Sequence, residues 1–482
     1  MQIIFIFLAL ILVVNIFLAI IVIFQEGREA SSSWAWILAV LFLPIIGTVL
    51  YFFFGLNPCR SRLFQWKDRK KIINQKKVRT QLAKLRSGQF HLRNQATRNS
   101  RDLIYMNLIN NHAIFSEDNT VELLMDGREK FNKLFKDIEE STDHIHLQYY
   151  IIKKDQLGKK ITDVLIKKAK EGVTIRVLYD GFGSRGLNKH FFKELLNAGG
   201  EVEVFFPSIF QFINLRLNYR NHRKLVIVDG KTGYLGGFNI GNEYLGLDPK
   251  FGYWRDTHIR IQGTSVHDIQ SRFILDWNQA SHSSKISYKP NYFSVPISNG
   301  DVGMQIVTSG PDSNCEHIKN GYIKMISIAK KSVLIQTPYL IPDKSLLDAL
   351  LIACFSGLEV KIMIPNKPDH MGIYWATFCF IGQLLKAGAK VFIYENGFIH
   401  AKTLVVDKEI SSIGSANFDV RSFKLNFEVN AFLYDEEIAQ SLTKAFMEDV
   451  KVSRELTLNQ YQKRPRLVRF KESIFRLLSP IL

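Results

Sequence analysis

The hydrophobic pattern begins with two long apolar runs that set the N-terminal part of the chain apart from the rest. Residues 3–24 are apolar except for Asn15, and residues 34–56 form a second run. Each run exceeds the ~20 residues that a helix needs to cross the hydrocarbon core of a membrane. A cleaved signal peptide is the alternative for the first run, but that run lacks a basic start and a small-residue cleavage site, and a second run follows at once. The pattern therefore predicts a transmembrane hairpin over residues 1–59, with spans at about 3–24 and 34–56.

The charges around these runs predict their orientation. The loop between the runs holds two acids and one arginine, whereas residues 60–71 hold six lysines and arginines. Because positively charged flanking segments stay on the cytoplasmic side of a membrane, we expect a two-span protein of the cell membrane whose remaining domains lie in the cytoplasm. Pro44 and Gly47 lie inside the second run and predict a kink there.

Beyond the apolar runs, short apolar strands alternate with helical periods, and the order repeats. Residues 145–150 resemble 333–339, and residues 173–178 resemble 358–363. In both copies the order is strand, helix, strand, helix, strand, motif strand and strand, which is typical of α/β layers. We therefore expect two tandem α/β domains, each long enough for its own core. The predicted divisions are a basic juxtamembrane linker at 60–110, a first domain at 111–290, a second domain at 291–460 and a basic amphipathic tail at 461–482.

The net charge of +18 does not indicate a nucleic-acid partner, because the charge is not spread over the body. Residues 60–100 hold thirteen cations and one acid, and residues 463–482 hold six cations and one acid, so the two domains are close to neutral. A nuclease needs its positive charge along the substrate channel. The tail mixes its cations with Phe475, Leu477 and Leu478, which predicts a surface helix on anionic lipid. A frayed terminus is the alternative.

The four cysteines show no spacing typical of metal ligands. Cys354 and Cys379 lie in apolar surroundings, so we expect buried free thiols in a reducing compartment. Cys59 and Cys315 suggest no further pairing, and neither a disulfide framework nor a metal site is predicted.

A motif of histidine, lysine, aspartate and asparagine occurs once in each predicted domain at the same spacing. Lysine follows histidine by two residues, aspartate follows it by seven, and a Gly-Gly or Gly-Ser pair begins fourteen residues after it. Recurrence of six positions in register indicates two half-sites, each with a histidine and a cation, that meet in one cleft. The first copy comprises His222, Lys224, Asp229 and Asn239, and the second comprises His400, Lys402, Asp407 and Asn417.

These residue types suit the exchange of a phosphodiester. Such a reaction needs a nucleophile, a proton donor for the departing alkoxide and fixed positive charge on the phosphoryl oxygens. The two histidines supply the first two functions and Lys224 and Lys402 supply the third, so neither a metal nor a nucleotide cofactor is expected. Asn239 and Asn417 are candidates for further hydrogen bonds to the phosphate, with turn-capping amides as the alternative. The sequence is symmetric and does not decide which histidine attacks.

The paired motifs resemble those of the phospholipase D superfamily, and with the two apolar runs they resemble the bacterial cardiolipin synthases over nearly the whole length. This resemblance implies two tandem phospholipase D-like α/β domains that share a central active site. It also implies that His222 is the nucleophile that forms a phosphohistidine and that His400 is the general acid and base. The further strings that carry the resemblance stand at 54–58, 179–184, 236–244, 254–257 and 337–343.

Four acids complete the predicted site. Asp256 and Glu428 follow their motifs by 34 and 28 residues, counted from the histidine, and are candidates to fix the histidine tautomers. A strand-edge acid in a salt bridge is the alternative for both. Asp229 and Asp407 each end an apolar strand. The resemblance implies a structural position behind the site for this pair, and a turn residue is an equal interpretation.

The two copies differ in ways that bear on the substrate. The first has Gly237 where the second has Ser415, so Ser415 is a candidate phosphate ligand that the first half lacks. The first half also carries an apolar insertion at 205–215, for which contact with lipid and burial in the core are both open. An apolar aromatic stretch at 370–380 has the same two interpretations.

The predicted reaction is transphosphatidylation. One phosphatidylglycerol transfers its phosphatidyl group to His222 and releases glycerol, and the terminal hydroxyl of a second phosphatidylglycerol accepts the group to give cardiolipin. A hydrolytic membrane phospholipase D and a transphosphatidylase with another alcohol or donor use the same residues and remain alternatives. The neutral body disfavours a membrane-tethered nuclease, and the two intact motifs disfavour an inactive lipid-binding scaffold. The expected partners are phosphatidylglycerol and anionic membrane lipids, without nucleic acid, and the sequence leaves homo-oligomers open.

Overall fold

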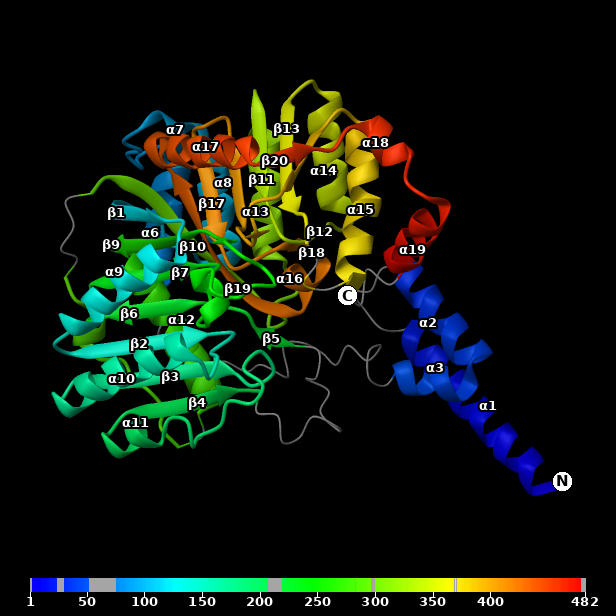
Figure 1. Ribbon diagram of the computed structural model, residues 1–482, viewed down its shortest axis with the longest axis horizontal. Helices are drawn as coiled ribbons and strands as arrows, with labels where there is room; N and C mark the ends of the chain where they lie inside the picture. The colour runs from blue at the N-terminus through cyan, green and yellow to red at the C-terminus, as the bar shows by residue number, and fades with distance from the viewer. Residues whose placement is uncertain are drawn as a thin grey trace.

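The main body of the protein is a mixed sheet of sixteen strands with helices on both faces (Figure 1). The computed structural model describes residues 2–23, 30–51, 75–206, 219–281, 283–295, 300–367, 369 and 371–477. Strand β6 (Leu225–Val228) shows why both faces of the sheet are apolar. Leu225 and Ile227 join one hydrophobic cluster, and Val226 and Val228 join another. The predicted α/β layering is confirmed.

The sheet consists of two halves with the same strand order. The first half runs β4-β3-β2-β6-β7-β9-β1, and the second runs β14-β13-β11-β16-β17-β19-β10, with β20 added at its outer edge. The halves join where β1 pairs antiparallel with β10, with Ser116 opposite Met304. Because equivalent strands meet in an antiparallel pair, the halves are related by an approximate twofold rotation. The predicted duplication is therefore confirmed.

The first half begins with the strand that joins the two halves and ends with a long helix. Its elements are β1 (Ser116–Leu124), α9 (Gly127–Glu139), β2 (His144–Tyr149), α10 (Gln156–Lys170), β3 (Thr174–Asp180), α11 (Lys193–Asn197), β4 (Glu201–Phe205), β5 (Arg220–Asn221), β6, β7 (Thr232–Gly236), the 3-10 helix Asn242–Leu245, β8 (Trp254–Arg255), β9 (His258–Gln262) and α12 (Ser265–Ala280). The 3-10 helix Pro290–Phe293 leads to the second half.

The second half repeats this plan with short additional strands. Its elements are β10 (Val302–Ser309), α13 (His317–Ile328), β11 (Ser332–Gln336), β12 (Leu340–Ile341), α14 (Lys344–Phe355), β13 (Glu359–Pro365), α15 (Met371–Lys386), β14 (Lys390–Tyr394), β15 (Phe398–Ile399), β16 (Thr403–Val406), β17 (Ile410–Gly414), β18 (Phe418–Asp419), α16 (Val420–Lys424), β19 (Asn426–Tyr434), α17 (Glu436–Lys451) and β20 (Ser453–Glu455).

The helices that cover the sheet fall into three hydrophobic clusters. Residues of α12 and α17 share one cluster that spans both halves. On the opposite face, α9, α10 and α11 cover the first half, and α13, α14 and α15 cover the second. The central cluster therefore fixes the two halves to one another, which is what a site built from both halves requires.

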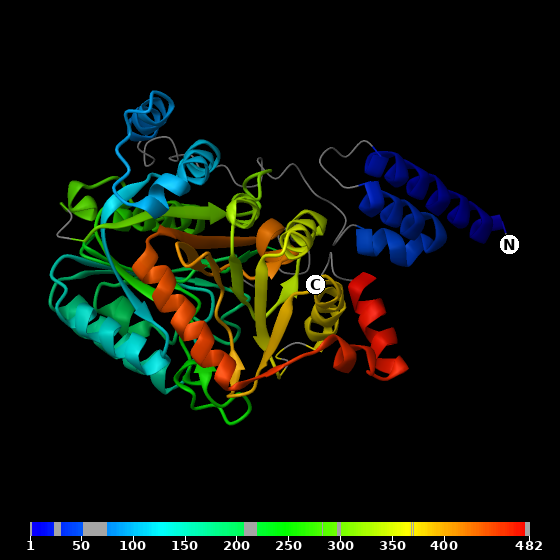
Figure 2. The same ribbon diagram turned by 90° about the horizontal axis from the view of Figure 1, so that it is seen from above.

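The N-terminal apolar part forms three helices beside the body (Figures 1 and 2). They are α1 (Gln2–Ile23), α2 (Ala30–Phe42) and α3 (Pro44–Leu50). The second apolar run is broken at Leu43, because Pro44 begins a new helix there, which confirms the kink predicted at that residue. Among the helices that the structure describes, none is long and apolar enough to cross a membrane. The predicted two-span hairpin is thus not confirmed.

The basic linker and the tail are helical where the structure describes them. Helices α6 (Gln75–Arg86), α7 (Gln95–Asn99) and α8 (Arg101–Asn111) follow residues 52–74, which lie outside the described part. Although this linker precedes the first half, its apolar side chains join the cluster of the second half. The tail forms α18 (Leu458–Gln462) and α19 (Arg466–Leu477), and α19 packs against α15.

Two apolar stretches singled out in the sequence have different outcomes. Most of the 205–215 insertion lies outside the described residues, which resume at Tyr219. The stretch at 370–380 forms the start of α15, where Ala376, Phe378 and Phe380 are buried and Met371 is exposed. This stretch therefore contributes mainly to the core.

Candidate active site

Each motif histidine is fixed by a backbone contact with the other half of the molecule. Strand β5 pairs in parallel with β19 of the second half, with Asn221 opposite Phe427, and the His222 N–H donates to the Phe427 carbonyl at 2.9 Å. Strand β15 pairs in parallel with β8 of the first half in the same way, and the His400 N–H donates to the Arg255 carbonyl at 2.7 Å. The residue after each carbonyl is an acid, so each histidine is placed beside the acid of the opposite half.

The side chains complete this crossed arrangement. His222 Nδ1 lies 2.9 Å and 3.0 Å from the two carboxylate oxygens of Glu428. His400 Nδ1 lies 2.6 Å from Asp256 Oδ2. Both carboxylates are fully buried. A carboxylate only accepts hydrogen bonds, so Nδ1 carries the proton in both histidines and Nε2 keeps a free lone pair.

The protonation states agree with this tautomer. Burial lowers the pKa of His222 to about 4, although the Glu428 carboxylate opposes the effect. Burial also lowers the pKa of His400, and the charge on Lys402 adds to the effect. Burial alone would raise the pKa of Asp256, but the charge on Lys402 and the hydrogen bond from His400 bring it below its usual value. At neutral pH the site therefore holds neutral imidazoles on charged carboxylates.

The two lysines supply positive charge that both halves share. Each is buried, and each Nζ donates to the carbonyl of its own histidine, Lys224 to His222 at 2.7 Å and Lys402 to His400 at 2.5 Å. Burial lowers the pKa of Lys224 to about 7 and that of Lys402 to about 8. The charge on Lys402 acts on His222, and the charge on Lys224 acts on His400. The structure thus brings both motifs to one site.

The motif aspartates bind the backbone of neighbouring turns. Asp229 accepts hydrogen bonds from the N–H groups of Thr142, Asp143 and His144, between α9 and β2. In the second half, the Asp407 carboxylate accepts from the equivalent turn between α13 and β11, through the N–H groups of Lys330, Lys331 and Ser332. Both aspartates have positive φ, 53° and 55°. This geometry fits the structural interpretation of the two aspartates.

The candidate phosphate ligands already have contacts within the protein. Asn239 accepts from the Ile151 N–H and donates to the Tyr244 hydroxyl. The side-chain oxygen of Asn417 is buried without a hydrogen-bond partner in the described part of the chain. Ser415 donates to Glu428 at 2.5 Å, so its proton serves the acid that holds His222. Phosphate binding by these residues remains a prediction.

The difference between Gly237 and Ser415 follows from the acid that each one contacts. A Cβ atom at Gly237 would lie 2.0 Å from Asp256 Oδ1, which leaves no space for a serine. The longer Glu428 side chain lies where the Ser415 hydroxyl reaches it. In each half-site the residue at this position therefore fits beside the acid that it contacts, Gly237 beside Asp256 and Ser415 beside Glu428.

Three residues that the sequence analysis did not assign to the site also surround the histidines. The Tyr150 ring lies edge-on to His222, with ring centres 4.8 Å apart, and the Trp254 ring lies 5.2 Å from His400. Arg223 is buried, forms an ion pair with Asp276 at 2.7 Å and donates to the Glu428 carbonyl. A signal for Arg223 was present in the sequence, because the second copy has alanine at this motif position.

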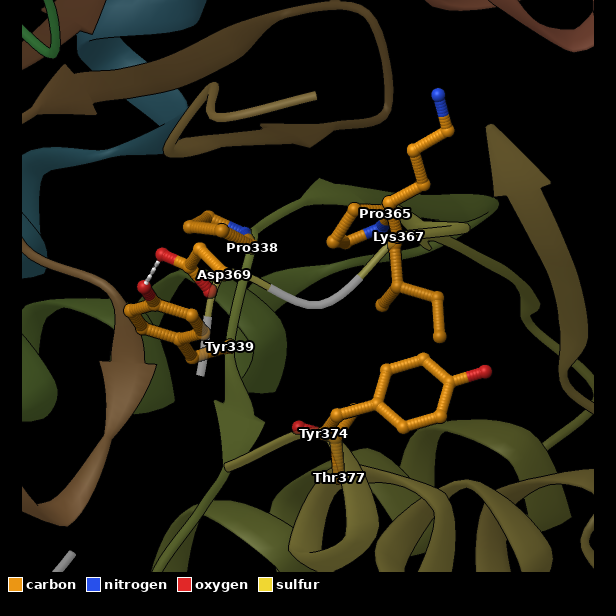
Figure 3. A pocket seen from close by; sticks show the side chains of 8 residues that line it. Pro338, Tyr339, Pro365, Lys367, Asp369, Tyr374 and Thr377 are labelled. Carbon is orange, nitrogen blue, oxygen red and sulfur yellow. Dashed lines mark hydrogen bonds between the residues drawn. The ribbon is translucent and has the colours of Figure 1, made fainter. Parts of the chain in front are cut away.

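A small hollow lies beside the second half-site (Figure 3). Its wall includes Tyr339, whose hydroxyl donates to the Asp369 carboxylate, and Thr377 of α15. The charge on Asp369 acts on Lys402 and opposes the burial that lowers its pKa. The tyrosine and the aspartate on this side of the site are thus hydrogen-bonded to each other.

Residues that suit a metal or a disulfide do not cluster in the described ranges. No group of three or more His, Cys, Asp or Glu residues is placed there to hold a metal ion. Cys315 is an exposed free thiol, and Cys354 and Cys379 are partly buried free thiols. Cys59 lies outside the described residues.

Known proteins share both the sequence and the fold. Residues 134–273 and 322–450 match the family described as "Cardiolipin synthase, PLD-like domain", and residues 13–55 match the one described as "Phospholipase_D-nuclease N-terminal". The major cardiolipin synthase ClsA of Bacillus subtilis (strain 168) is 65% identical over 477 residues, which cover 99% of each chain. The cardiolipin synthase of Listeria welshimeri is 52% identical over 475 residues, which cover 98% of each chain.

A solved structure shows the same fold at low sequence identity. The phosphatidylserine synthase of Haemophilus influenzae Rd KW20 has a TM-score of 0.62 and 16% identity, and the alignment covers 81% of this chain and 100% of that one. With the family match over both halves and the full-length relatives, these findings show that the chain belongs to the cardiolipin synthase family of proteins with phospholipase D-like domains.

Proposed function

We propose that this chain is a phosphatidyltransferase that makes cardiolipin and glycerol from two molecules of phosphatidylglycerol. The observation that carries the proposal is the pair of crossed histidine–carboxylate contacts, His222 with Glu428 and His400 with Asp256, next to two lysines. Two neutral histidines with free Nε2 atoms provide a nucleophile and a proton carrier at one place. The activity named for relatives that are 65% and 52% identical over the full length supports the same reaction.

In the first step, His222 Nε2 attacks the phosphorus of one phosphatidylglycerol. A P–N bond forms, the P–O bond to the glycerol headgroup breaks, and His400 gives its Nε2 proton to the departing alkoxide. The anionic phosphodiester favours protonation of His400 beforehand, because a nearby negative charge raises the pKa of an imidazole. Lys224 and Lys402 neutralise the phosphoryl oxygens.

In the second step, the terminal hydroxyl of another phosphatidylglycerol gives its proton to His400 and attacks the same phosphorus. The P–N bond breaks and a new P–O bond forms. One phosphodiester therefore replaces another, and the reaction needs no energy-rich cosubstrate. The role of His222 as the nucleophile rests on the resemblance to the phospholipase D superfamily. The acids Glu428 and Asp256 act as positioning residues that keep Nδ1 protonated.

The membrane is the proposed location of this reaction, because both substrates are membrane lipids. The apolar N-terminal part supports an anchor, since Ile6, Phe17 and Phe42 are exposed to the surroundings. In the arrangement predicted from the sequence, two spans enter the cell membrane and the catalytic body lies on the cytoplasmic side. The basic helix α19 adds contact with anionic lipid.

The test uses the purified full-length protein in detergent micelles with labelled phosphatidylglycerol, without added metal or nucleotide. We expect cardiolipin and free glycerol in equal amounts. His222→Ala and His400→Ala should each lower the rate by roughly 10²–10⁴-fold, and His190→Ala, a change at an exposed histidine, should not.

Trapping separates the roles of the two histidines. Peptides from protein denatured at alkaline pH, where a P–N bond survives, should carry a phosphatidyl adduct on His222 in the wild type, and the adduct should persist in His400→Ala. Phosphatidic acid as the sole product would instead assign a hydrolytic phospholipase D. An adduct on His400 would reverse the two roles.

A further inference from the structure

The cations around the two histidines are not distributed as the duplicated motif would suggest. Arg220 stands two residues before His222, whereas Phe398 stands two residues before His400. Alternate side chains of an extended strand lie on the same face, so Arg220 shares a face with His222. Phe398 is fully buried, and its ring lies 4.8 Å from the Trp254 ring. One histidine therefore has a cation on its face of the strand, and the other has an apolar ring.

A second position repeats this asymmetry. Arg421 follows His400 by twenty-one residues, and the matching residue of the first half is Glu243. Arg421 lies in α16 (Val420–Lys424), which contacts β19, the strand whose Asn426 pairs with Arg220, so it lies at the His222 end of the site. Glu243 is buried and forms an ion pair with Lys153 at 2.6 Å. Arg220 in place of a phenylalanine and Arg421 in place of a glutamate therefore both add positive charge at the His222 end of the site.

A third arginine joins this group through Phe182. The central guanidinium carbons of Arg185 and Arg220 lie 3.7 Å and 3.6 Å from the centre of the Phe182 ring. The neighbouring acid, Asp180, directs its carboxylate to three backbone N–H groups, those of Phe182, Gly183 and Asn221. Asp419, two residues before Arg421, likewise accepts from the Ser422 N–H. Apart from Glu428, which holds His222, three arginines therefore outnumber two acids at this end of the site, an arrangement that an anion stabilises.

We infer that Arg185, Arg220 and Arg421 form a binding site for the phosphate of the acceptor phosphatidylglycerol. This inference rests on the proposed function. The two phosphates of cardiolipin are joined by one glycerol, so the acceptor's own phosphate must lie a glycerol length from the phosphorus on His222. Arg220 stands two residues before His222 and pairs with Asn426, two residues before Glu428, which places the arginines next to the reacting histidine.

This site gives the second step its selectivity. Water and simple alcohols have no phosphate, so the arginines favour phosphatidylglycerol over them as the acceptor. The donor phosphate, in contrast, is held by the two lysines and the histidines. Loss of the arginines should therefore affect the acceptor step and leave formation of the phosphohistidine largely intact.

The experiment compares a charged and a neutral acceptor in the same micelles. The full-length wild type, Arg220→Gln and Arg421→Gln receive labelled phosphatidylglycerol, alone or with excess n-butanol, and cardiolipin, phosphatidylbutanol, phosphatidic acid and glycerol are measured. Lys153→Gln, at the cation of the opposite end, is the matched control. We expect cardiolipin formation to fall roughly 10- to 100-fold in the arginine variants, with a higher KM for phosphatidylglycerol and more phosphatidic acid.

Transfer to butanol decides the interpretation. It should stay within about twofold of the wild type in the arginine variants, and Arg220→Lys should recover part of the cardiolipin rate. Equal loss with both acceptors would overturn the acceptor site and indicate a role in folding or in donor binding. Unchanged cardiolipin formation would also overturn it. A wild type that makes phosphatidylbutanol but no cardiolipin would overturn the proposed function, and the acceptor site with it.

Discussion

At the scale of single residues, burial sets the charges on which the chemistry depends. Burial lowers the pKa of His222 to about 4, that of Lys224 to about 7 and that of Lys402 to about 8. The nucleophile must be neutral and the lysines must be charged. Both conditions hold only at a pH between the pKa of His222 and the pKa values of the lysines. Burial of these groups therefore limits the activity at low pH and at high pH.

This arrangement predicts a bell-shaped pH dependence of kcat/KM for cardiolipin formation. Activity should fall below a pH of about 4, where His222 gains a proton and loses its lone pair. It should fall on the alkaline side as His400, the acid of the first step, loses its proton, and it should fall further above about 7 to 8, where the lysines lose their charge. Lys224→Arg should reduce the second of these alkaline losses, because a guanidinium keeps its proton there. A flat profile up to about pH 10, measured in micelles with an unchanged fold by circular dichroism, would contradict the assignment of the lysines.

At the scale of elements, the motif aspartates join each half-site to its sheet. Asp229 and Asp407 hold equivalent turns that lead into the central strands β2 and β11, each through three backbone N–H groups. Their equal spacing from the histidines in the two halves therefore reflects the length of β6 and β16, which separates the site from the turn. We predict that these aspartates support the motif without contacting the reacting atoms.

Replacing these aspartates should consequently lower stability more than catalysis. Asp229→Ala and Asp407→Ala leave backbone donors without partners, so each should destabilise the protein by about 1–3 kcal/mol. Thermal unfolding should shift downwards, while kcat per folded molecule should stay within about threefold of the wild type. Asp163→Ala, at an exposed position of α10, is the control. A loss of kcat as large as that of the histidine variants, without a change in melting temperature, would show that the aspartates act in the reaction.

The element scale also shows how far the sequence predicts the site. Periodicity and the repeat predict the order of strands and helices, and motif spacing predicts His222, Lys224, His400, Lys402 and the two orienting acids. The crossing of acids between halves is not predictable, because it depends on the pairs β5–β19 and β15–β8. Strands β5, β8 and β15 have two residues each, which is too short for a hydrophobic pattern, and the paired strands are distant in the sequence.

At the scale of the whole molecule, the apolar N-terminal helices and α19 lie on the same side of the body (Figures 1 and 2). Leu467, Phe470 and Ile474 of α19 are exposed, and Phe475 packs towards α15. The acid Glu472 is buried and paired with Arg464, so the outer face of α19 retains its basic residues. We predict that this amphipathic basic helix adds a second point of contact with anionic lipid and fixes the orientation of the body.

The last prediction follows from this second contact. Replacing both Leu467 and Phe470 by serine removes apolar surface that would enter the lipid interface, where each large side chain contributes about 1.5–3 kcal/mol. We expect cardiolipin synthesis by the full-length protein to fall at least several-fold in vesicles that contain anionic lipid, and to be unchanged in detergent micelles, where substrate surrounds the protein on all sides.

Met447→Ser, at an exposed site on α17, should change neither activity. Equal loss in vesicles and micelles would mean that α19 supports the fold through α15, and unchanged activity in vesicles would mean that the N-terminal helices alone position the body, so the comparison separates orientation at the membrane from stability.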